Sequence, residues 1–275
     1  VIFSSIYHLP LLGNGIVGAA SGEANIEGVV SGYEFTKYGG SNNAENSGTL
    51  KYVSIRHTGT AVSPGNELQG LTMGGVGSGT VIENIELIGS EDDGIEIFGG
   101  AVNVTNIVIA NFDDDGIDLD QAYDGTISNA VVIMAPGSDT VFEIDGTEEP
   151  NNAIVGEYTI KNVTAYGRSD AAKFDTFGNW KSDATGFNEN VLFVDFPAST
   201  TLGGIDSDTY DGAGTAPIEG KLNFKDFIVV TSDSKATVVG GQVDEASATW
   251  ISVSTTRPSS KGADESVFGW TQFFN

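Results

Sequence analysis

The sequence predicts an all-β chain that folds as a right-handed parallel β-helix, a solenoid with about 22 residues per turn and irregular N- and C-terminal caps. Three observations predict it: an internal repeat, an asparagine that recurs inside strand-like segments, and short β-rich runs separated by glycine, asparagine and aspartate. No apolar stripe of helical period extends beyond about ten residues. The right hand is the one that parallel crossover connections adopt.

The internal repeat lies between residues 79 and 120. In its first copy the strand-like run 81–88 precedes Glu-Asp-Asp-Gly-Ile-Glu-Ile at 91–97. In its second copy the run 103–109 precedes Asp-Asp-Asp-Gly-Ile-Asp-Leu at 113–119. Equivalent positions differ by 22 residues without a gap (115 − 93 and 118 − 96). Two such copies predict two stacked turns whose acidic segments lie one above the other.

An asparagine occupies the same place in successive predicted turns. Apolar residues stand two positions before it and one and three positions after it, so the alternation of a strand breaks there, as at a corner. We predict a ladder in which the stacked amides hydrogen-bond one another and free backbone groups. The predicted corner residues are Asn84, Asn106, Asn129, Asn162 and Asp226.

Two other repeat or β-rich folds fit the sequence less well. A leucine-rich repeat has a compatible period, but its leucine–asparagine signature and its helical half are missing. A jelly roll explains the β-rich composition but not a repeat that keeps its register. These comparisons favour the parallel β-helix.

The whole chain, residues 1–275, is predicted to form a single domain, because no linker interrupts it. Residues 1–45 are expected to form an N-terminal cap and residues 46–180 the regular turns. Residues 181–275 are expected to contain irregular turns, an acidic loop and a C-terminal cap. Within the N-terminal region we expect three rings to fill the core, with exposed rings as the alternative. These rings are Tyr33, Phe35 and Tyr38.

Composition excludes several functions. The 38 acidic and 12 basic residues give a net charge of −26, so nucleic-acid binding is not expected. No run of about 18 apolar residues is present, which argues against direct membrane insertion. The absence of cysteine excludes disulfides, thiolate catalysis and zinc–thiolate sites. Abundant glycine, serine, threonine and asparagine with little lysine is typical of extracellular bacterial proteins, so we predict an extracellular or cell-surface location.

Carboxylates dominate the outward half of the repeat. Alternation from the inward-facing isoleucines directs Glu96 and Asp118 outward, and stacked strands lie ~4.8 Å apart. Two carboxylates at that spacing repel by roughly 3–4 kcal/mol at an effective dielectric of 20, and a cation, a raised pKa or splaying into water relieves the repulsion. We predict calcium, with a solvated acidic face as the alternative. The predicted metal ligands are Asp92, Asp93, Glu96, Asp114, Asp115 and Asp118.

The paired acidic motifs also resemble the polygalacturonase type of β-helix glycosidase, in which motifs one turn apart supply a general acid and a general base. On that resemblance the catalytic candidates are Asp93, Asp115 and Asp118, and inverting hydrolysis would need carboxyl groups about 6.5–9.5 Å apart. The Gly-His-Gly and Arg-Ile-Lys motifs of that family are missing, since His8 and His57 are the two histidines. The catalytic residues therefore stay unassigned.

A pectate-lyase-type reaction is the other catalytic hypothesis. It needs calcium and a basic residue that removes the proton beside a uronate carboxylate. Arg56 and His57 precede the acidic turns, and Arg168 and Lys173 follow them. Each is better explained as a surface charge or an ion-pair partner.

Polysaccharide recognition without catalysis would use exposed aromatic rings. Tyr123 and Trp180 lie in loop-like contexts and are the predicted ligand-binding residues.

Segments 46–57, 68–77 and 92–100 resemble the pectate-lyase-like superfamily of right-handed β-helices. More closely, they resemble secreted, envelope-associated β-helix proteins of Gram-negative bacteria. This resemblance covers about residues 45–135 and implies surface attachment, glycan binding or glycan cleavage. We therefore expect a secreted or cell-surface module, structural, adhesive or glycan-binding and stabilised by calcium. A polysaccharide hydrolase or lyase that uses the stacked acidic turns is the alternative.

Overall fold

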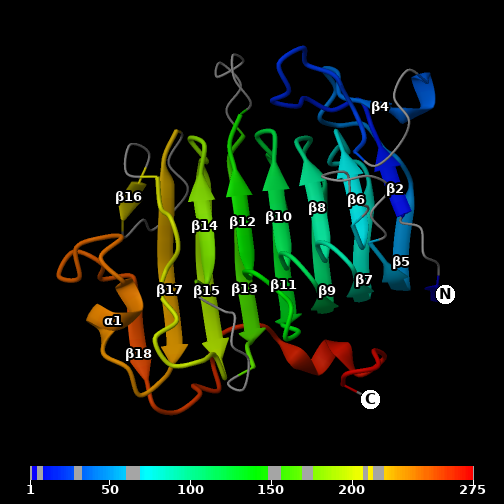
Figure 1. The fold of residues 1–275 in the computed structure, drawn as a ribbon. Helices are drawn as coiled ribbons and strands as arrows, with labels where there is room; N and C mark the ends of the chain where they lie inside the picture. Colours follow the sequence, from blue (N-terminus) through cyan, green and yellow to red (C-terminus); the bar gives the residue numbers. More distant parts are fainter. Residues whose placement is uncertain are drawn as a thin grey trace.

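Successive strands of the chain stack in parallel along one axis and form two sheets of a right-handed β-helix (Figure 1). The fold was obtained as a computed structural model. Short β-rich runs with apolar alternation become its strands, and the intervening glycines and asparagines become its corners. The structure describes residues 2–4, 9–27, 33–59, 69–147, 156–168, 176–206, 210–212 and 220–274.

The longer sheet has the strand order β1-β5-β7-β9-β11-β13-β15-β17-β16, and β18 also pairs with β17. Its pairings are parallel, as in the pair of β7 and β9 that carries the sequence repeat. The strands are β1 (Ile2–Ser4), β5 (Thr49–Thr58), β7 (Val81–Ser90), β9 (Asn103–Phe112), β11 (Thr126–Ile133), β13 (Tyr158–Tyr166), β15 (Gly186–Val194), β16 (Tyr210–Gly212), β17 (Leu222–Val230) and β18 (Ile251–Ser254).

The shorter sheet has the strand order β14-β12-β10-β8-β6-β2 and carries the segments that follow the acidic motifs. As far as β14, its strands alternate along the chain with those of the longer sheet, so each of these turns contributes one strand to each sheet. They are β2 (Leu9–Leu12), β6 (Leu71–Gly74), β8 (Ile95–Phe98), β10 (Ile117–Asp120), β12 (Phe142–Asp145) and β14 (Gly178–Lys181).

The remaining elements are short. They are the antiparallel pair β3 (Ala24–Asn25) and β4 (Lys37–Tyr38), the 3-10 helices η1 (Glu34–Thr36) and η2 (Glu265–Phe268), and the helix α1 (Lys235–Val239). Among the described residues, the helices are all too short and too polar to cross a bilayer.

The predicted asparagine ladder is confirmed. The corner residues adopt the left-handed backbone conformation, with φ of 58° at Asn84 and Asn106 and 61° at Asn129. The Asn106 amide donates to Asn84 Oδ1 at 3.1 Å, and the Asn129 amide donates to Asn106 Oδ1 at 2.7 Å. Each corner therefore interrupts the extended backbone of its strand. Corners of the same kind lie at Asn162, Asn190 and Asp226.

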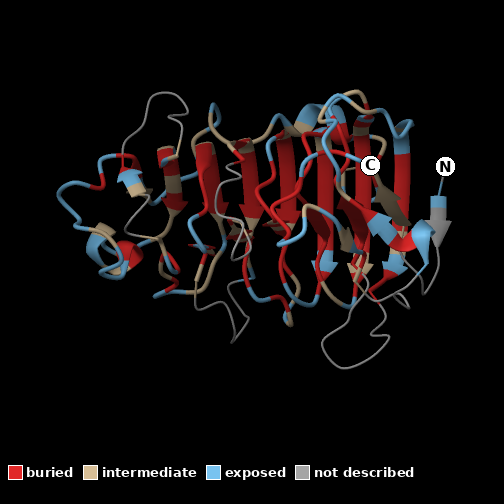
Figure 2. Ribbon diagram, turned by 90° about the horizontal axis from the view of Figure 1, so that it is seen from above, coloured by how far each residue is buried: buried red, intermediate tan, exposed pale blue. Residues whose placement is uncertain are grey.

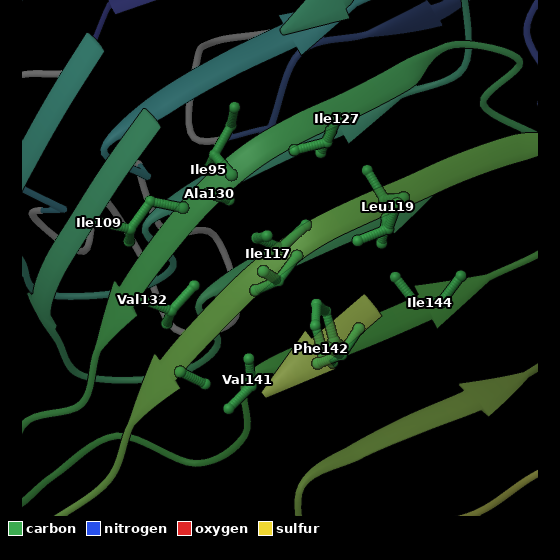
Figure 3. Packing of buried hydrophobic residues seen from close by; sticks show 14 of the residues in the cluster. Ile95, Ile109, Ile117, Leu119, Ile127, Ala130, Val132, Val141, Phe142 and Ile144 are labelled. Atoms are coloured by element: carbon green, nitrogen blue, oxygen red, sulfur yellow. The ribbon is translucent and has the colours of Figure 1, made fainter. Parts of the chain in front are cut away.

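The interior of the solenoid is one continuous apolar column. Ile95, Ile97, Ile117 and Leu119 are fully buried, as the alternation predicts. Figure 3 shows Ile95, Ile117 and Leu119 packed with residues of β9, β11 and β12 inside the coil. Figure 2 shows this column as red strands between partly exposed loops.

The ladder of strands extends beyond both expected boundaries of the regular turns. β2 pairs with β6 in the shorter sheet, so stacking begins before residue 45. β15 and β17 continue the longer sheet in register well beyond residue 180. Inward apolar residues keep the turns stacked there, although the acidic motif that marks the turns in the sequence is missing.

The C-terminal residues 255–274, here called the C-terminal strap, run back along the asparagine corners (Figure 1). The amide of Gly262 donates to Asn190 Oδ1 at 3.0 Å, and the amide of Asp264 donates to Asn129 Oδ1 at 2.6 Å. Near the first turns, the amide of Gln272 donates to Glu86 Oε1 at 2.5 Å. Hydrogen bonds to two corner asparagines and to Glu86 therefore hold the strap against the solenoid.

Candidate cation site on the shorter sheet

Five side chains form a row on the outer face of the shorter sheet. Parallel pairing aligns Thr72 with Glu96, Glu96 with Asp118, Asp118 with Glu143, and Glu143 with Asn179. Because the inward positions on either side carry apolar residues, alternation directs this row away from the core. Three carboxylates thus occupy three consecutive turns.

Neighbouring polar groups satisfy the two ends of this row. Lys181 Nζ contacts Glu143 and lies 3.3 Å from Asp145 Oδ2. At the other end, the Thr72 hydroxyl donates to Gln69 Oε1 at 2.8 Å. Within the described ranges, no basic side chain forms an ion pair with Glu96 or Asp118. Among the side chains that the structure describes, no cation is therefore paired with the middle of the row.

The aspartate directly before the glycine of each acidic motif links successive turns. Asp93 Oδ1 accepts a 2.9 Å hydrogen bond from the amide of Asp115. Asp115 Oδ1 in turn accepts from Thr140, from its amide at 2.7 Å and from its hydroxyl at 2.5 Å. The acidic repeat predicts repulsion between stacked carboxylates, and it did not lead us to expect that Asp93 and Asp115 accept hydrogen bonds from the next turn. An aspartate directly before the corner glycine in both copies was the available signal.

Asp93, Glu96 and Asp118, here called the acidic triad, converge at the start of β8 and β10. One carboxylate oxygen from each lies within 4.8 Å of the other two. Glu96 is 5% exposed and Asp93 is similarly buried, whereas Asp118 is intermediate. Glu96 Oε2 and Asp118 Oδ1 are buried and have no hydrogen-bond partner. Glu96 faces outward as predicted, and it is nevertheless buried, which does not fit the alternative of a solvated acidic face at this position.

The electrostatics of the triad follow from this burial. Burial, followed by the charge of Asp93, raises the pKa of both Glu96 and Asp118 well above the usual range of a carboxyl group. Burial also raises the pKa of Asp93, and the charges of Asp92 and Asp115 add to the effect. For Asp115, burial raises the pKa to about 8 despite the hydrogen bonds from Thr140. Without a cation, these groups favour their protonated forms.

The other predicted metal ligands form two adjoining groups. Asp92, Asp93 and Asp114 make one, and Asp114, Asp115 and Asp139 make the other, each with oxygens within 4.8 Å of one another. Asp114 and Asp139 are exposed, so water can solvate these groups. All six predicted ligands therefore lie together, but the triad alone combines convergence with buried, unpartnered oxygens among the described groups.

The donor set of the triad suits a hard cation. Carboxylate oxygens are ligands of calcium and magnesium, whereas zinc prefers histidine and cysteine. The chain has no cysteine, and His57 lies on β5 of the other sheet. Calcium tolerates irregular geometry, while magnesium demands a regular octahedron and keeps several waters. A buried cluster of three carboxylates from two turns therefore fits calcium better.

The same geometry is a poor arrangement for inverting hydrolysis. That reaction needs carboxyl groups about 6.5–9.5 Å apart so that a water fits between them. The triad oxygens lie within 4.8 Å of one another, and the Asp93 and Asp115 carboxylates each accept a hydrogen bond from the backbone. These aspartates are thus built into the stacking of the solenoid.

Two of the basic residues considered for lyase chemistry, Arg56 and His57, lie on β5 of the longer sheet, whereas the triad lies on the shorter sheet. Arg56 Nη2 donates to Glu86 Oε2 at 2.8 Å on the longer sheet, and Arg56 Nε donates to Ser54 Oγ at 2.7 Å. His57 lies on the same strand as Arg56. Lys173 lies outside the described residues. Arg56 therefore acts as an ion-pair partner, which was the favoured interpretation.

The two predicted ligand-binding rings lie in the core. Tyr123 is 2% exposed, and its hydroxyl donates to the Val102 carbonyl at 2.6 Å. Trp180 is 0% exposed, and its ring centroid lies 5.0 Å from that of Phe224. The prediction that these rings are exposed is wrong, because Trp180 continues the inward row through Ile144 and Tyr123 turns inward at a corner.

The family of the chain follows from its similarity to a known family of proteins. No curated protein and no solved structure matches it significantly. The family described as "Pectate-lyase like beta helix domain" matches residues 11–274, nearly the whole chain. That match agrees with the two parallel sheets and the asparagine corners. The chain belongs to the pectate-lyase-like β-helix domain family.

Proposed function

We propose that this chain is a non-catalytic, extracellular or cell-surface bacterial module whose β-helix is stabilised by calcium bound at the acidic triad. The observation that carries the proposal is the pair of buried oxygens, Glu96 Oε2 and Asp118 Oδ1, which have no hydrogen-bond partner. A buried ionised carboxylate without a partner is costly, and a cation between the carboxylates removes that cost.

The spacing of the triad supports calcium. Calcium–oxygen distances are about 2.3–2.6 Å, so two oxygens on opposite sides of one ion lie roughly 5 Å apart. The triad oxygens lie within 4.8 Å of one another and fit inside that span. Backbone carbonyls or water would complete the coordination, since calcium takes about six to eight oxygens.

The surroundings support a structural role for the ion. Asp93 belongs both to the triad and to the hydrogen bond that joins β8 to β10 through Asp115. An ion held there would tie two turns together at the point where the carboxylates repel. Extracellular modules bind calcium with Kd values of about 10⁻⁴–10⁻³ M, which suits an external location.

Removal of the metal tests the proposal. The full chain, treated with a chelator and then titrated with calcium, is expected to bind one ion per chain. At a hundredfold excess over Kd, its Tm is expected to rise by roughly 5–10 °C. Scanning calorimetry gives the Tm and isothermal titration calorimetry gives the stoichiometry. An unchanged Tm together with no detectable binding at millimolar calcium would contradict the proposal.

Two substitutions locate the ion. Glu96→Gln keeps the size of the side chain and is expected to lower calcium affinity by roughly tenfold, or about 1.4 kcal/mol. The matched control is Asp139→Asn, an exposed acid of the adjoining group, which should leave the affinity unchanged. Equal affinities in the Glu96→Gln variant and the unsubstituted chain would show that calcium binds elsewhere.

Polysaccharide hydrolysis or cleavage is the second candidate. It is favoured by Asp115, whose pKa of about 8 would keep a carboxyl protonated at neutral pH, as a general acid requires. A panel of plant and algal polysaccharides, assayed for reducing ends and for unsaturated products, tests it. Product formation that is lost in Asp115→Asn and Asp118→Asn would establish catalysis and overturn the non-catalytic proposal.

A further inference from the structure

The N-terminal lobe, residues 13–27 and 33–46, lies at the carboxyl ends of β6, β8 and β10, beside the first turns (Figure 1). Its small core consists of Val17, Ala19, Ile26 and Tyr38 packed against Phe98 of β8. The Tyr38 hydroxyl donates to Gln121 Oε1 at 3.2 Å and joins the lobe to the corner after β10. The lobe is thus attached through its own buried residues.

Two aromatic rings of the lobe remain outside this core. Tyr33 is 54% exposed and Phe35 is 74% exposed. Their ring centroids lie 5.2 Å apart with an interplanar angle of 23°, so they stack on each other. Of the three rings expected to fill the core, Tyr38 does so, while Tyr33 and Phe35 form an exposed pair. Isolated surface rings are ordinary, but a stacked pair forms a contiguous apolar surface.

A polar cavity adjoins this pair. It has a volume of about 550 Å³, and its lining includes Asn14, Glu23, Glu34, Lys37 and Asn42. Glu34 lines the cavity and stands between Tyr33 and Phe35 in the chain, so each ring belongs to a residue next to the cavity wall. Carboxylates, amides and an ammonium group offer both acceptors and donors of hydrogen bonds.

We propose that the N-terminal lobe binds a neutral glycan, with Tyr33 and Phe35 as the stacking surface and the polar cavity as the hydrogen-bonding surface. A sugar ring presents an apolar face of C–H groups and a rim of hydroxyls. The stacked pair matches the face, and the cavity matches the rim. This site lies apart from the acidic triad, and the inference does not depend on calcium binding.

The charges of the lobe favour a neutral glycan over a uronate polymer. Glu23, Glu34 and Glu45 line the cavity together with one lysine, and that lysine forms a 3.0 Å ion pair with Glu34. The net charge of the whole chain is −26. An anionic polysaccharide would be repelled at this site, because nothing in the described lining supplies a surplus of positive charge.

Retention of the full chain on polysaccharides tests the inference, with calcium present throughout. Affinity electrophoresis and a glycan array should show retention on neutral polysaccharides and none on polyuronates. The double variant Y33A/F35A is expected to weaken binding by roughly tenfold with an unchanged Tm, since both rings are exposed. Asn14→Ala, which alters the cavity alone, should weaken binding without moving the Tm.

The matched control is Phe273→Ala, because Phe273 is an exposed ring of the C-terminal strap. It should bind as tightly as the unsubstituted chain. Equal binding by Y33A/F35A, preferential binding of polyuronates, or no binding to any neutral glycan would each overturn the inference. Calcium binding is scored by calorimetry without glycan, so a failure here is separate from a failure of the calcium proposal. Binding of a protein partner in place of glycans would also overturn the inference that the lobe binds a neutral glycan.

Discussion

The amide of Asp115 donates a 2.9 Å hydrogen bond to Oδ1 of Asp93, one turn earlier in the solenoid. The equivalent bond one turn later joins the amide of Thr140 to Asp115. The acidic repeat therefore serves two purposes. One oxygen of each aspartate holds neighbouring turns together, and under the proposed function calcium balances the remaining negative charge.

Substitutions of Asp93 should separate these two purposes. Asp93→Asn retains a carbonyl acceptor and removes a charge, so calcium-free protein should be as stable as the unsubstituted chain or more so. Asp93→Ala leaves the buried amide of Asp115 without its acceptor and should destabilise by roughly 1–3 kcal/mol. Urea unfolding in the presence of chelator measures both. Equal destabilisation by asparagine and alanine would contradict the acceptor role.

The asparagine corners should depend on both backbone conformation and amide bonding. Asn106 has φ of 58° and bonds through its side chain to Asn84 and Asn129. Asn106→Gly loses the amide bonds but has no Cβ to strain the left-handed backbone. Asn106→Ala loses the same bonds and keeps a Cβ in the left-handed region, at a cost of about 1–2 kcal/mol. In urea unfolding, the unsubstituted chain should therefore have the highest free energy of unfolding, the Asn106→Gly variant a lower one, and the Asn106→Ala variant the lowest. A variant with alanine as stable as the glycine variant would show that backbone strain is unimportant at the corner.

The C-terminal strap should contribute through one buried ring. Phe268 is fully buried against Val108 and Val131 on the outer face of the longer sheet. Phe268→Ala should cost roughly 3–5 kcal/mol, the usual range for a buried phenylalanine. Phe273→Ala, on the same strap but exposed, should change stability by about 0.5 kcal/mol or less. Similar losses in the two variants would contradict this assignment of the anchor.

The stability of calcium-free protein should decrease as pH rises. The Asp115 carboxyl has a pKa of about 8 in the folded chain, against 3.8 for the ordinary group. Between those values the folded state holds a proton that the unfolded state has released. The stabilising contribution is therefore complete below pH 3.8 and is lost as pH rises through about 8.

Urea unfolding from about pH 5 to pH 9 in chelator measures this slope, and Asp115→Asn should flatten it. Saturating calcium should also flatten it, because a cation stabilises the ionised carboxylates. An identical slope in the Asp115→Asn variant would show that the proton is bound at other groups.

Much of the fold could be predicted because it depends on local, repeated patterns. Ile95 and Ile117 face inward because side chains alternate along a strand and the apolar positions of these strands are buried. Asn84 and Asn106 bend their strands because asparagine tolerates a positive φ. The same alternation placed Glu96 and Asp118 outside the coil. Six acidic residues could likewise be grouped, since stacking at a constant register brings equal positions together.

The sequence alone therefore determined the parallel solenoid, its corners and the meeting of the acidic turns, because each depends on a repeat between neighbouring turns. Tertiary structure decided what covers those turns. The burial of Glu96, the inward direction of Tyr123, the exposure of Tyr33 and Phe35, and the path of the C-terminal strap all depend on contacts between distant segments. No periodic pattern encodes such contacts, because each is made once and its free energy depends on the shape of both partners.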